Sequence, residues 1–308
     1  MRLYKYLSKP RTILNDGYIR ATQLSCLNDP FEAKYCKTGL EKLCLAHNID
    51  YKDSLAHITN EINKVGVISL TEAKDNLLMW AHYADEHRGV AIGLDVYEDP
   101  YVRGQICIFE NLIDRPNPYA CFDGFDVFSS GRVKPVRYRK QPKFRVDAFD
   151  LDFEHLDMTQ GEALLYEVFF NKSDEWSYEK EHRAVLHLSQ ADKVLVPNNI
   201  QLRSTLKKQF ESLSALDLGD DFIELHLEKI DDASMRIALG NNVATLALYP
   251  SVIFLFKLKE GVITNMVFGF RSHSKRFEPQ PHYVQRAHCF EYEKASIDDS
   301  YVLNFDSF

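Results

Sequence analysis

The sequence predicts a fold of mixed α and β structure, and three observations lead to this prediction. First, hydrophobic residues make up 45% of the 308 residues and charged residues 27%, which is typical of a folded globular protein. Second, a strand, a helix and another strand follow one another within residues 65–96, the length of a βαβ unit or a split variant of one. Third, apolar runs of strand length recur after residue 197.

The N-terminal residues predict two short strands, Leu3–Leu7 and Tyr18–Ala21, separated by a helical turn. Gly17 is a suitable left-handed cap at the end of that turn. Residues 27–32, with the sequence LNDPFE, are expected to form a loop, because Pro30 disfavours helical geometry in the residue before it. The chain is therefore expected to open with two strands and a polar loop.

The strand–helix–strand unit begins with a β-branched strand, Val65–Leu70. A helix is expected over residues 76–88, with Asp75 as its N-cap and Gly89 at its C-terminal end. The chain then returns as a strand over Val90–Val96. The apolar stripe of the helix is predicted to consist of Leu77, Trp80, Ala81 and Ala84.

Outside this unit, the spacing of apolar residues predicts further elements. Alternation with a period of two indicates a strand, whereas apolar residues three and four positions apart indicate a helix. A polar tail is expected at the C-terminus. The predicted helices cover residues 40–46, 54–63, 162–171 and 200–213, and the predicted strands cover residues 133–138, 176–188, 222–227, 251–258, 262–270 and 282–293.

These elements are expected to build one core. Residues 1–190 carry the polar motifs and are predicted to form an α/β domain. Residues 191–308 are predicted to be a C-terminal α/β extension that packs on the same core and need not be a separate domain.

Charge and composition indicate whether the chain binds nucleic acid, which cellular compartment it occupies and whether it spans a membrane. The formal net charge of −8 argues against broad binding to nucleic-acid backbones, although a basic stretch at residues 132–145 could touch nucleic acid or simply form a solvated strand and loop. Six cysteines without a C-x-x-C pair, and no signal segment, indicate a reducing cytoplasm. The longest apolar run, Val252–Phe256, is far shorter than the roughly 20 residues of a spanning helix. We expect a soluble cytoplasmic protein without membrane contact.

The segment WSYEKEHRAVLHL, Trp176–Leu188, carries the strongest indication of a functional site. In a strand, Glu179, Glu181 and Arg183 would share one face. Two carboxylates about 7 Å apart repel unless a cation or a ligand compensates them, and such electrostatic costs are common at functional sites. A surface ladder of salt bridges is the alternative interpretation.

Aromatic and polar side chains near this segment offer further ligand contacts. Trp176 and Tyr178 could stack on a base, or they could pack in the core or at an edge. Asn28, Asp29 and Glu32 lie in a loop polar enough to close over a ligand, although an Asx-turn explains the same residues.

The helix predicted over residues 76–88 carries a third group of polar residues. His82 or Tyr83, beside Trp80, is expected to hydrogen-bond to the loops of a cleft, and both are candidate ligand contacts. No metal is expected there, because His82 and His87 are five residues apart rather than four and no H-E-x-x-H motif occurs.

Four motifs, in the same order, together resemble an uncharacterised bacterial family of domains of unknown function. That family is met among genes of defence and mobile-element neighbourhoods, and the resemblance covers about residues 1–190. The motifs are LYKY at residues 3–6, LNDPFE at residues 27–32, LLMWAHYADEHRGVAIGLD at residues 77–95 and KSDEWSYEKEHR at residues 172–183.

The chain is also similar to ADP-ribosyltransferases in the order of an aromatic-basic strand, an Ile-Leu-x-x-Gly turn, a strand ending in serine and a Glu-x-Glu strand. This resemblance implies a split mixed sheet, flanked by helices, that clasps NAD. It gives Lys5 the role of gripping the cofactor, Ser69 that of orienting nicotinamide, and Glu181 that of the final carboxylate, with Glu179 beside it. The other expected contacts to the nucleotide are Tyr6, Asn28, Asp29, Glu32, Trp80, His82, Tyr83, Trp176, Tyr178 and Arg183.

A glutamate suits this chemistry, because breaking the bond between nicotinamide and ribose develops oxocarbenium character that an oriented carboxylate stabilises. Glu179 could position or deprotonate an acceptor, and repulsion between Glu179 and Glu181 is expected to raise the pKa of at least one of them. Without a second base, hydrolysis to free ADP-ribose is the expected outcome.

The resulting hypothesis is an NAD-dependent ADP-ribosyltransferase or NAD glycohydrolase that acts in bacterial defence or as a toxin-like effector, with protein and nucleic acid among the candidate acceptors. A non-catalytic sensor that binds a nucleotide or a partner is the alternative. The two differ in whether Glu181 lines a concave pocket with Lys5 and Ser69. The Glu-x-Lys pairs at residues 32–34 and 72–74 leave a metal-dependent nuclease as a remote third option.

Overall fold

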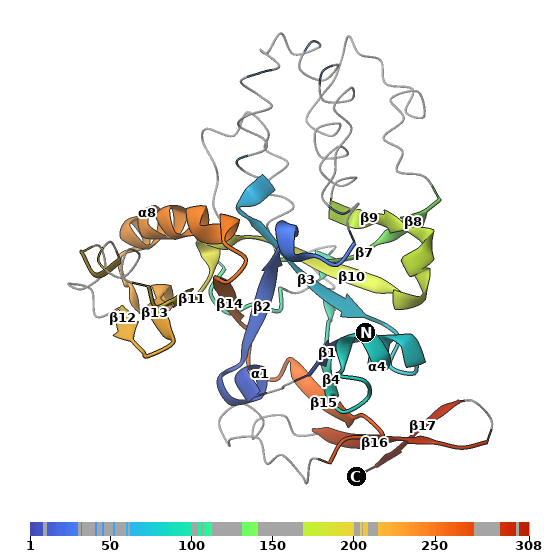
Figure 1. Ribbon diagram of the computed structural model, residues 1–308. Coiled ribbons are helices and arrows are strands. Elements are labelled where there is room, and N and C mark those ends of the chain that lie inside the picture. The colour runs from blue at the N-terminus through green and yellow to red at the C-terminus, as the bar shows by residue number, and fades with distance from the viewer. Residues whose placement is uncertain are drawn as a thin grey trace.

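The computed structural model shows one large mixed sheet with short helices around it (Figure 1), which confirms the predicted mixture of α and β structure. No helix in the described part of the chain is both long enough and apolar enough to cross a membrane. The structure describes residues 1–8, 11–29, 32, 41, 45, 52, 60, 62–99, 104–105, 107–112, 131–140, 169–199, 204, 206–208, 215–273, 290–299 and 302–307.

The N-terminal elements form as predicted. β1 (Arg2–Leu7) and β2 (Tyr18–Gln23) are joined by the short helix α1 (Arg11–Asp16), and the 3₁₀ turn η1 (Leu24–Cys26) follows. Gly17 adopts a φ of 70°, and its N–H donates to a carbonyl oxygen four residues earlier at 3.1 Å. The left-handed glycine closes the last helical turn and lets β2 begin at once.

The strand–helix–strand unit consists of β3 (Val65–Thr71), α4 (Leu77–Tyr83) and β4 (Val90–Asp95). β1 lies between β3 and β4 and pairs antiparallel with both, so β3 and β4 run parallel with one strand between them. The unit is therefore the split variant of a βαβ unit. The helices predicted over residues 40–46 and 54–63 lie almost wholly outside the described residues.

α4 begins one residue later than predicted, and Asn76 rather than Asp75 caps it. The side-chain oxygen of Asn76 accepts hydrogen bonds from the backbone N–H groups of Leu78 at 2.9 Å and Met79 at 3.2 Å. These N–H groups have no partner within the helix. The sequence did not separate the two candidates, because aspartate and asparagine are equally favoured at an N-cap.

The predicted end of this helix at Arg88 is wrong, because α4 ends at Tyr83. Residues 85–87 adopt φ values of 47°, 50° and 70°, a left-handed conformation that a right-handed helix cannot include. The N–H of Gly89 donates to the carbonyl oxygen of Ala84 at 2.8 Å. Glycine thus ends this turn rather than the helix itself.

The buried face of α4 also differs from the predicted stripe. Trp80 and Ala84 are buried as expected, but Leu77 is 45% exposed, Ala81 is half-buried, and Met79 is buried in their place. A helix of about two turns has too few residues for a periodic stripe to determine its orientation. Its packing against β1 determines the buried face instead.

The remaining strands extend the same sheet in both directions. Their order is β12-β13-β11-β14-β2-β3-β1-β4-β15-β16-β17, and β10 with β7 pairs along the other edge of β3. Residues 191–308 therefore contribute strands next to both β2 and β4. The strands that complete the sheet are β7 (Val133–Pro135), β10 (Glu181–His187), β11 (Lys193–Pro197), β12 (Leu216–Leu218), β13 (Phe222–His226), β14 (Ile253–Lys257), β15 (Ile263–Phe268), β16 (Glu291–Ile297) and β17 (Leu303–Ser307).

Two further strand pairs lie outside this sheet. β5 (Glu98–Asp99) pairs with β6 (Gly104–Gln105), and β8 (Arg137–Arg139) pairs in parallel with β9 (Asn171–Ser173). The single strand predicted over residues 133–138 is thus two short strands, β7 and β8. Of the helix predicted over residues 162–171, the structure describes only the end, which leads directly into β9.

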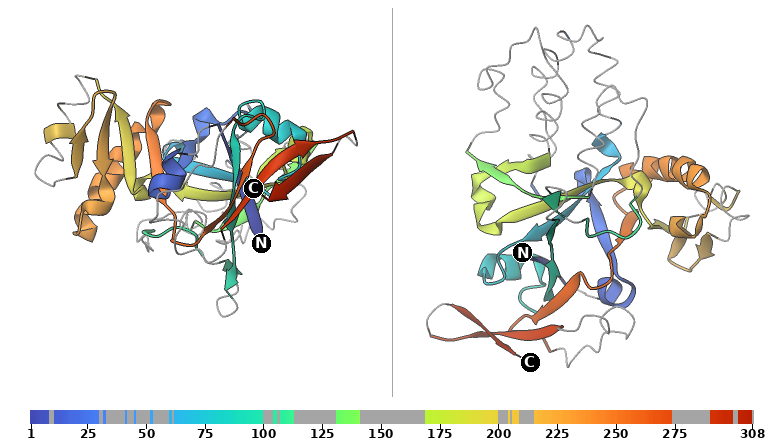
Figure 2. Two further views of the ribbon diagram at one scale, coloured as in Figure 1. Left: turned by 90° about the horizontal axis from the view of Figure 1, so that it is seen from below. Right: turned by 180° about the vertical axis from the view of Figure 1, so that it is seen from behind.

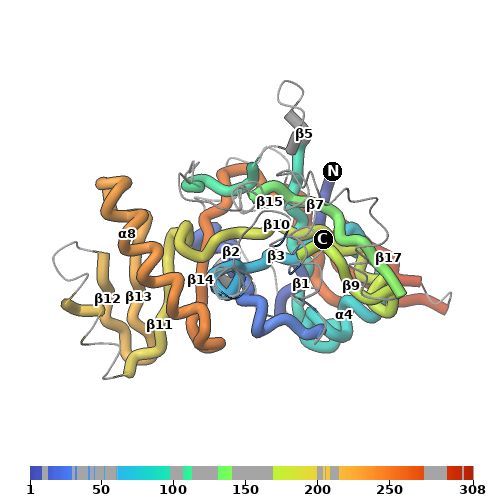
Figure 3. Tube along the Cα trace, turned by 90° about the horizontal axis from the view of Figure 1, so that it is seen from above, coloured from blue at the N-terminus to red at the C-terminus, as the bar shows by residue number. Residues whose placement is uncertain are grey.

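The sheet divides at β3, because two strands share one of its edges. Thr22 of β2 pairs with Val67 near one end of β3, whereas Tyr4 of β1 pairs with Thr71 at the other end. Residues 68–70 lie between these pairings, and β10 occupies the opposite edge along the whole strand. The two arms run away from β3 to opposite sides, one ending at β12 and the other at β17 (Figures 1 and 3).

The core follows from the alternation of side chains along the strands. On β1, Leu3 belongs to a large apolar cluster that includes Ile68 and Ile92, whereas Tyr4 and Tyr6 belong to a smaller cluster on the other face of the strand. The larger cluster extends through β11, β13 and β14. Each face of the divided sheet is therefore packed.

Two predictions for the later part of the chain are wrong. The predicted strand over residues 176–188 begins only at Glu181, because residues 174–179 form a 3₁₀ helix, η4 (Asp174–Glu179). The C-terminal residues do not remain a polar tail, since β17 pairs antiparallel with β16.

Of the strand predicted over residues 282–293, only the end is described, and it opens β16. The predicted strands over residues 222–227, 251–258 and 262–270 are confirmed as β13, β14 and β15.

Helix α8 (Ala233–Ala244) was not predicted, because its apolar residues form no stripe. It lies beside the arm that contains β11, β13 and β14 (Figure 2) and packs on the 3₁₀ turn η5 (Leu188–Gln190). Gly240 makes this close approach feasible, since a Cβ atom there would lie 2.1 Å from the carbonyl oxygen of Ser189.

We expect Gly240→Ala to lower the free energy of unfolding by roughly 1–3 kcal/mol, because the new methyl group would force α8 away from η5. Helix propensity alone predicts that the free energy of unfolding would instead rise, by about 1 kcal/mol. Urea denaturation measures the change in this free energy relative to the wild-type protein. Asn241→Ala, at the exposed next position of α8, is the control and should be neutral or slightly stabilising. A stabilised Gly240→Ala variant would contradict the packing argument.

Candidate functional site

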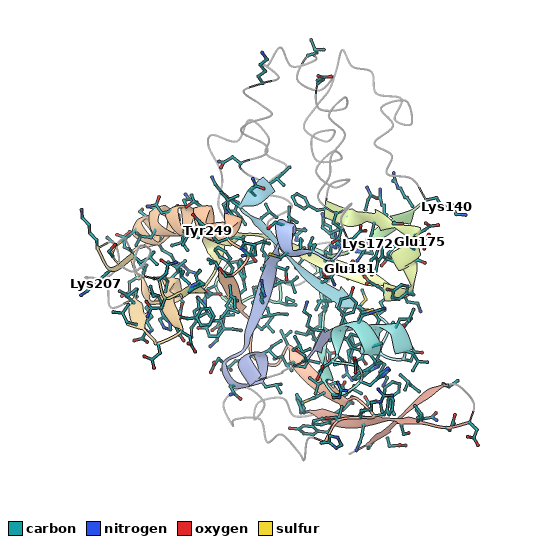
Figure 4. The ribbon with its side chains drawn as sticks, viewed as in Figure 1. Lys140, Lys172, Glu175, Glu181, Lys207 and Tyr249 are labelled. Carbon is teal, nitrogen blue, oxygen red and sulfur yellow. The ribbon has the colours of Figure 1, made fainter. Side chains whose placement is uncertain are left out.

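A cavity of about 240 Å³ opens where β1 and β2 separate along the edge of β3. Its walls come from β1, β2, β3, α4, β9, η4, β10 and the loop after β2. Lys172 and Glu181, two of its lining residues, are labelled in Figure 4. The lining residues are Tyr4, Lys5, Tyr6, Thr22, Cys26, Leu27, Asn28, Glu32, Ser69, Leu70, Thr71, Met79, Tyr83, Lys172, Glu179, Glu181 and Arg183.

Lys5 and Ser69 meet across the division of the sheet. The ammonium of Lys5 donates to the carbonyl oxygen of Ser69 at 3.0 Å, at the edge of β3 that lies between the pairings with β2 and β1. The ammonium thus satisfies a backbone acceptor in this gap. Burial lowers the pKa of Lys5 to about 8, although the charge of Glu181 opposes this shift.

Glu181 and Arg183 share one face of β10, as predicted, and form a bidentate ion pair. The Nε and Nη2 atoms of Arg183 lie 2.7 and 2.9 Å from the two carboxylate oxygens of Glu181. Arg183 also donates to the carbonyl oxygen of Phe169 at 2.8 Å and to the carboxylate of Glu32. Each nitrogen of this buried guanidinium therefore donates to at least one acceptor.

The expectation that repulsion raises a pKa in the pair is wrong for Glu181. Burial by itself would raise this pKa, but the charges of Arg183 and Lys172, and hydrogen bonds from Arg183 and Ser69, lower it from 4.5 to about 2. Glu181 is therefore an ionised carboxylate at neutral pH.

Glu179 reaches the cavity from a 3₁₀ turn rather than from a strand. It is the last residue of η4, and Lys180 follows in the left-handed region with a φ of 43°. The turn still brings the Glu179 side chain near Glu181. One carboxylate oxygen of Glu179 accepts from the Tyr83 hydroxyl at 2.6 Å, and burial together with this carboxylate raises the pKa of Tyr83.

Lys172 joins three carboxylates and was not singled out from the sequence. Its ammonium lies 2.7 Å from Glu179 Oε2, 3.2 Å from Glu181 Oε2 and 3.4 Å from Glu32 Oε1, and its side chain is only 6% exposed. Burial opposes its charge, but the three carboxylates raise its pKa above the ordinary value. Lys172 belongs to the motif KSDEWSYEKEHR, yet an irregular turn separates it from Glu179 and Glu181, so no periodic spacing connects them.

The loop after β2 contributes two of its three predicted residues to the cavity. Asn28 lines it and hydrogen-bonds to Tyr83, and Glu32 lines it through its ion pairs with Arg183 and Lys172. Asp29 is buried but does not line the cavity.

Four more predicted ligand contacts, in addition to Asp29, lie outside the cavity lining. Trp80 is fully buried and donates its indole N–H to the carbonyl oxygen of Lys74 at 2.8 Å, whereas His82 is exposed. The rings of Trp176 and Tyr178 are half-buried, with their centroids 6.2 Å apart. Trp176 nevertheless supports the site, because the Lys172 ammonium lies 4.8 Å from its ring centroid.

Tyr6, the remaining predicted contact, lines the cavity and anchors it. Its hydroxyl donates to the carbonyl oxygen of Ala73 at 2.8 Å, and its ring meets that of Trp80 edge-on, with centroids 4.9 Å apart. Tyr138 of β8 is a further contact not singled out from the sequence, because its hydroxyl accepts from the backbone N–H of Glu181 at 2.7 Å. Burial raises the pKa of Tyr138 to about 12, so this hydroxyl stays protonated.

The Glu-x-Lys pairs do not assemble a metal site among the described residues. Glu32 is engaged by Arg183 and Lys172, and Glu72 lies 2.6 Å from Nε2 of His182. Within the described ranges, no three histidine, cysteine, aspartate or glutamate side chains cluster in a way that could hold a metal ion.

We expect Glu181 to make an acid-labile contribution to stability. Because folding lowers its pKa from 4.5 to about 2, this contribution is present above pH 4.5 and is lost as the pH falls toward 2. At pH 7, Glu181→Gln should lower the free energy of unfolding by roughly 3 kcal/mol, since Arg183 is left without its partner.

Urea denaturation of the wild-type protein and of Glu181→Gln between pH 7 and pH 2 tests this expectation. The difference between their free energies of unfolding should shrink below pH 4.5. Glu224→Gln removes an ion pair with Lys193 at a more exposed place and is the control, with an expected change below about 1 kcal/mol. A difference that stays constant down to pH 2 would contradict the role of the charge.

A comparison with known protein families finds a match that covers part of this site. Residues 79–184 match the family described as a protein of unknown function (DUF2971), which confirms the resemblance to an uncharacterised family. The match includes Tyr83, Lys172, Glu179, Glu181 and Arg183. No curated protein and no solved structure matches the chain significantly. Residues 79–184 are therefore similar to a domain of this family of unknown function.

Proposed function

We propose that this chain binds a nucleotide such as NAD and cleaves the glycosidic bond between nicotinamide and ribose. The observation that carries the proposal is the convergence of Lys5, Ser69 and Glu181, from three neighbouring strands, on one cavity. A binding surface could have left these residues far apart on a flat face. Their convergence in a concavity supports a site that encloses a reacting group.

The ionisation state of Glu181 suits the proposed chemistry. Cleavage of the bond leaves positive charge on the ribose ring, and a carboxylate already ionised in a dry site stabilises that charge without reorganisation. A pKa near 2 excludes Glu181 as a general acid at neutral pH. In the proposed complex a ribose hydroxyl donates to Glu181, replacing the hydrogen bond from Ser69.

The size of the cavity indicates how a dinucleotide would be held. At about 240 Å³ the cavity is smaller than the roughly 300–1,000 Å³ of most ligand clefts. It could take the nicotinamide end, and the adenosine end would stay outside. Tyr4, Tyr6, Met79 and Tyr83 supply flat and polarisable surfaces that suit an aromatic ring.

The surroundings of Glu179 favour water as the acceptor. One oxygen of Glu179 accepts from Tyr83 and the other from Lys172, and the side chain is 5% exposed. A macromolecular acceptor could not reach it without displacing both partners. In the proposed reaction the C1′–N bond breaks, its electron pair passes to nicotinamide, and the oxygen of water bonds to C1′ as its proton leaves to solvent.

The hydrogen bonds of Glu181 also support a second candidate, a sensor that binds a nucleotide without turnover. Arg183 supplies two donors, and Lys172 and Ser69 supply one each. Together they occupy about four acceptor sites, which is the capacity of a carboxylate. A saturated carboxylate is typical of a rigid recognition site, such as a defence system that detects a nucleotide would need.

We expect Glu181→Gln to reduce cleavage of NAD by about 100-fold or more, because the amide carries no charge to stabilise the developing cation. The assay is release of nicotinamide from labelled NAD by the full-length protein, with circular dichroism to show that the variant is folded. Glu224→Gln, far along the sheet on β13, is the matched control and should retain wild-type turnover.

The products decide among the alternatives. Free ADP-ribose indicates hydrolysis, and label retained on protein or nucleic acid indicates transfer by an ADP-ribosyltransferase. Binding of NAD without turnover favours the sensor. If the wild-type protein neither binds nor cleaves NAD, the proposal is rejected. It is also rejected if Glu181→Gln cleaves NAD as fast as the wild-type protein.

A further inference from the structure

We propose that Lys172 is a positioning residue that holds Glu179 and Glu181 in the arrangement required for cleavage. This inference rests on the proposed function, and it adds a residue whose contacts are to the carboxylates rather than to the nucleotide. The ammonium of Lys172 bridges oxygens of Glu179 and Glu181 that repulsion would otherwise drive apart.

The shape of an ammonium group fits this position. It carries three N–H donors in a tripod, and three carboxylate oxygens lie 2.7, 3.2 and 3.4 Å from Nζ. The planar fork of arginine matches one carboxylate with two donors and cannot reach three separate oxygens equally. The fit explains a lysine at position 172 beside an arginine at position 183.

The backbone holds Lys172 in register with Glu181. Lys172 on β9 pairs with Tyr138 on β8, and both of these side chains contact Glu181, one at its carboxylate and the other at its backbone N–H. The ring of Trp176 lies on the remaining side of the ammonium, 4.8 Å away. Lys172 is thus fixed before any ligand arrives.

Removing the ammonium would leave Arg183, among the described residues, as the cation that pairs directly with these buried carboxylates. Glu32 and Glu181 would keep Arg183, whereas Glu179 would keep only the hydroxyl of Tyr83. Lys5 on β1, Tyr138 on β8 and Tyr178 on η4 are further ionisable groups that interact with the pair. We therefore expect at least one of the glutamates to take up a proton at a higher pH, or to turn away from its partner.

The test compares Lys172→Met, which removes the charge, with Lys172→Arg, which keeps the charge but changes its geometry. Lys193→Met is the matched control, because Lys193 also pairs with a glutamate and lies over an aromatic ring, that of Tyr18, but far from the cavity. Carbon-13 NMR of labelled glutamate carboxyls follows titration directly and needs no activity. Glu179→Gln and Glu181→Gln assign the two signals.

For Lys172→Met we expect the titration midpoint of Glu181 to rise by about one unit or more, because the charge of Lys172 lowers it in the wild-type protein. Lys172→Arg should give a clearly smaller rise, and Lys193→Met none at this residue. Titration in Lys172→Met that matches the wild-type protein would overturn the proposal. So would an equal rise in Lys193→Met, since the effect would then be general.

Kinetics separate positioning from direct binding. We expect Lys172→Met to lower kcat at least about 10-fold with KM changed less than about threefold, and to move the acidic limb of the rate profile to higher pH. Lys172→Arg should recover the pH profile better than it recovers kcat. A raised KM with unchanged kcat would mean that Lys172 binds the substrate, which overturns positioning. If the wild-type protein does not cleave NAD, the proposed function fails, while the NMR titration still decides the role of Lys172.

Discussion

The division of the sheet at β3 is the constraint on which the rest of the site depends. β2 and β1 share one edge of β3, so a short stretch between their pairings has no neighbouring strand on that side. The ammonium of Lys5 satisfies the carbonyl oxygen of Ser69 in this gap. A continuous sheet would have used the same carbonyl for a strand and closed the space. The cavity is therefore a consequence of strand topology.

The site also contains several buried charged side chains, and each compensates the lost hydration of the others. The side chains of Glu32, Glu179, Glu181 and Lys172 are all less than one-tenth exposed, and isolated ions at such depth would lose several kcal/mol of hydration. With Arg183 they form one network in which opposite charges lie within hydrogen-bonding distance. The network keeps Glu181 ionised in a poorly hydrated place, which is the property that the proposed cleavage of a glycosidic bond uses.

Sequence patterns anticipated the regular parts of this structure and failed at its irregular parts. Alternation along β10 correctly placed Glu181 and Arg183 on one face, and short runs of apolar, aromatic and β-branched residues identified β1, β3, β4 and β15. The same rule wrongly extended β10 back through residues 174–179, where a 3₁₀ turn and a left-handed residue 180 interrupt the strand. Left-handed residues 85–87 likewise ended α4 early, and non-glycine residues in that conformation leave little trace in a sequence.

By itself, the sequence determined the strands that alternate, the strand–helix–strand unit, the resemblance to an uncharacterised family and the acidic pair followed by an arginine. These features depend on neighbours in the chain, which local periodicity records. Only the tertiary structure decided that Glu32, Lys172 and Glu181 meet, and that Lys5 spans a gap in the sheet. Such contacts join segments far apart in the chain, and no local spacing encodes them, because the path of the chain between the segments sets the distance.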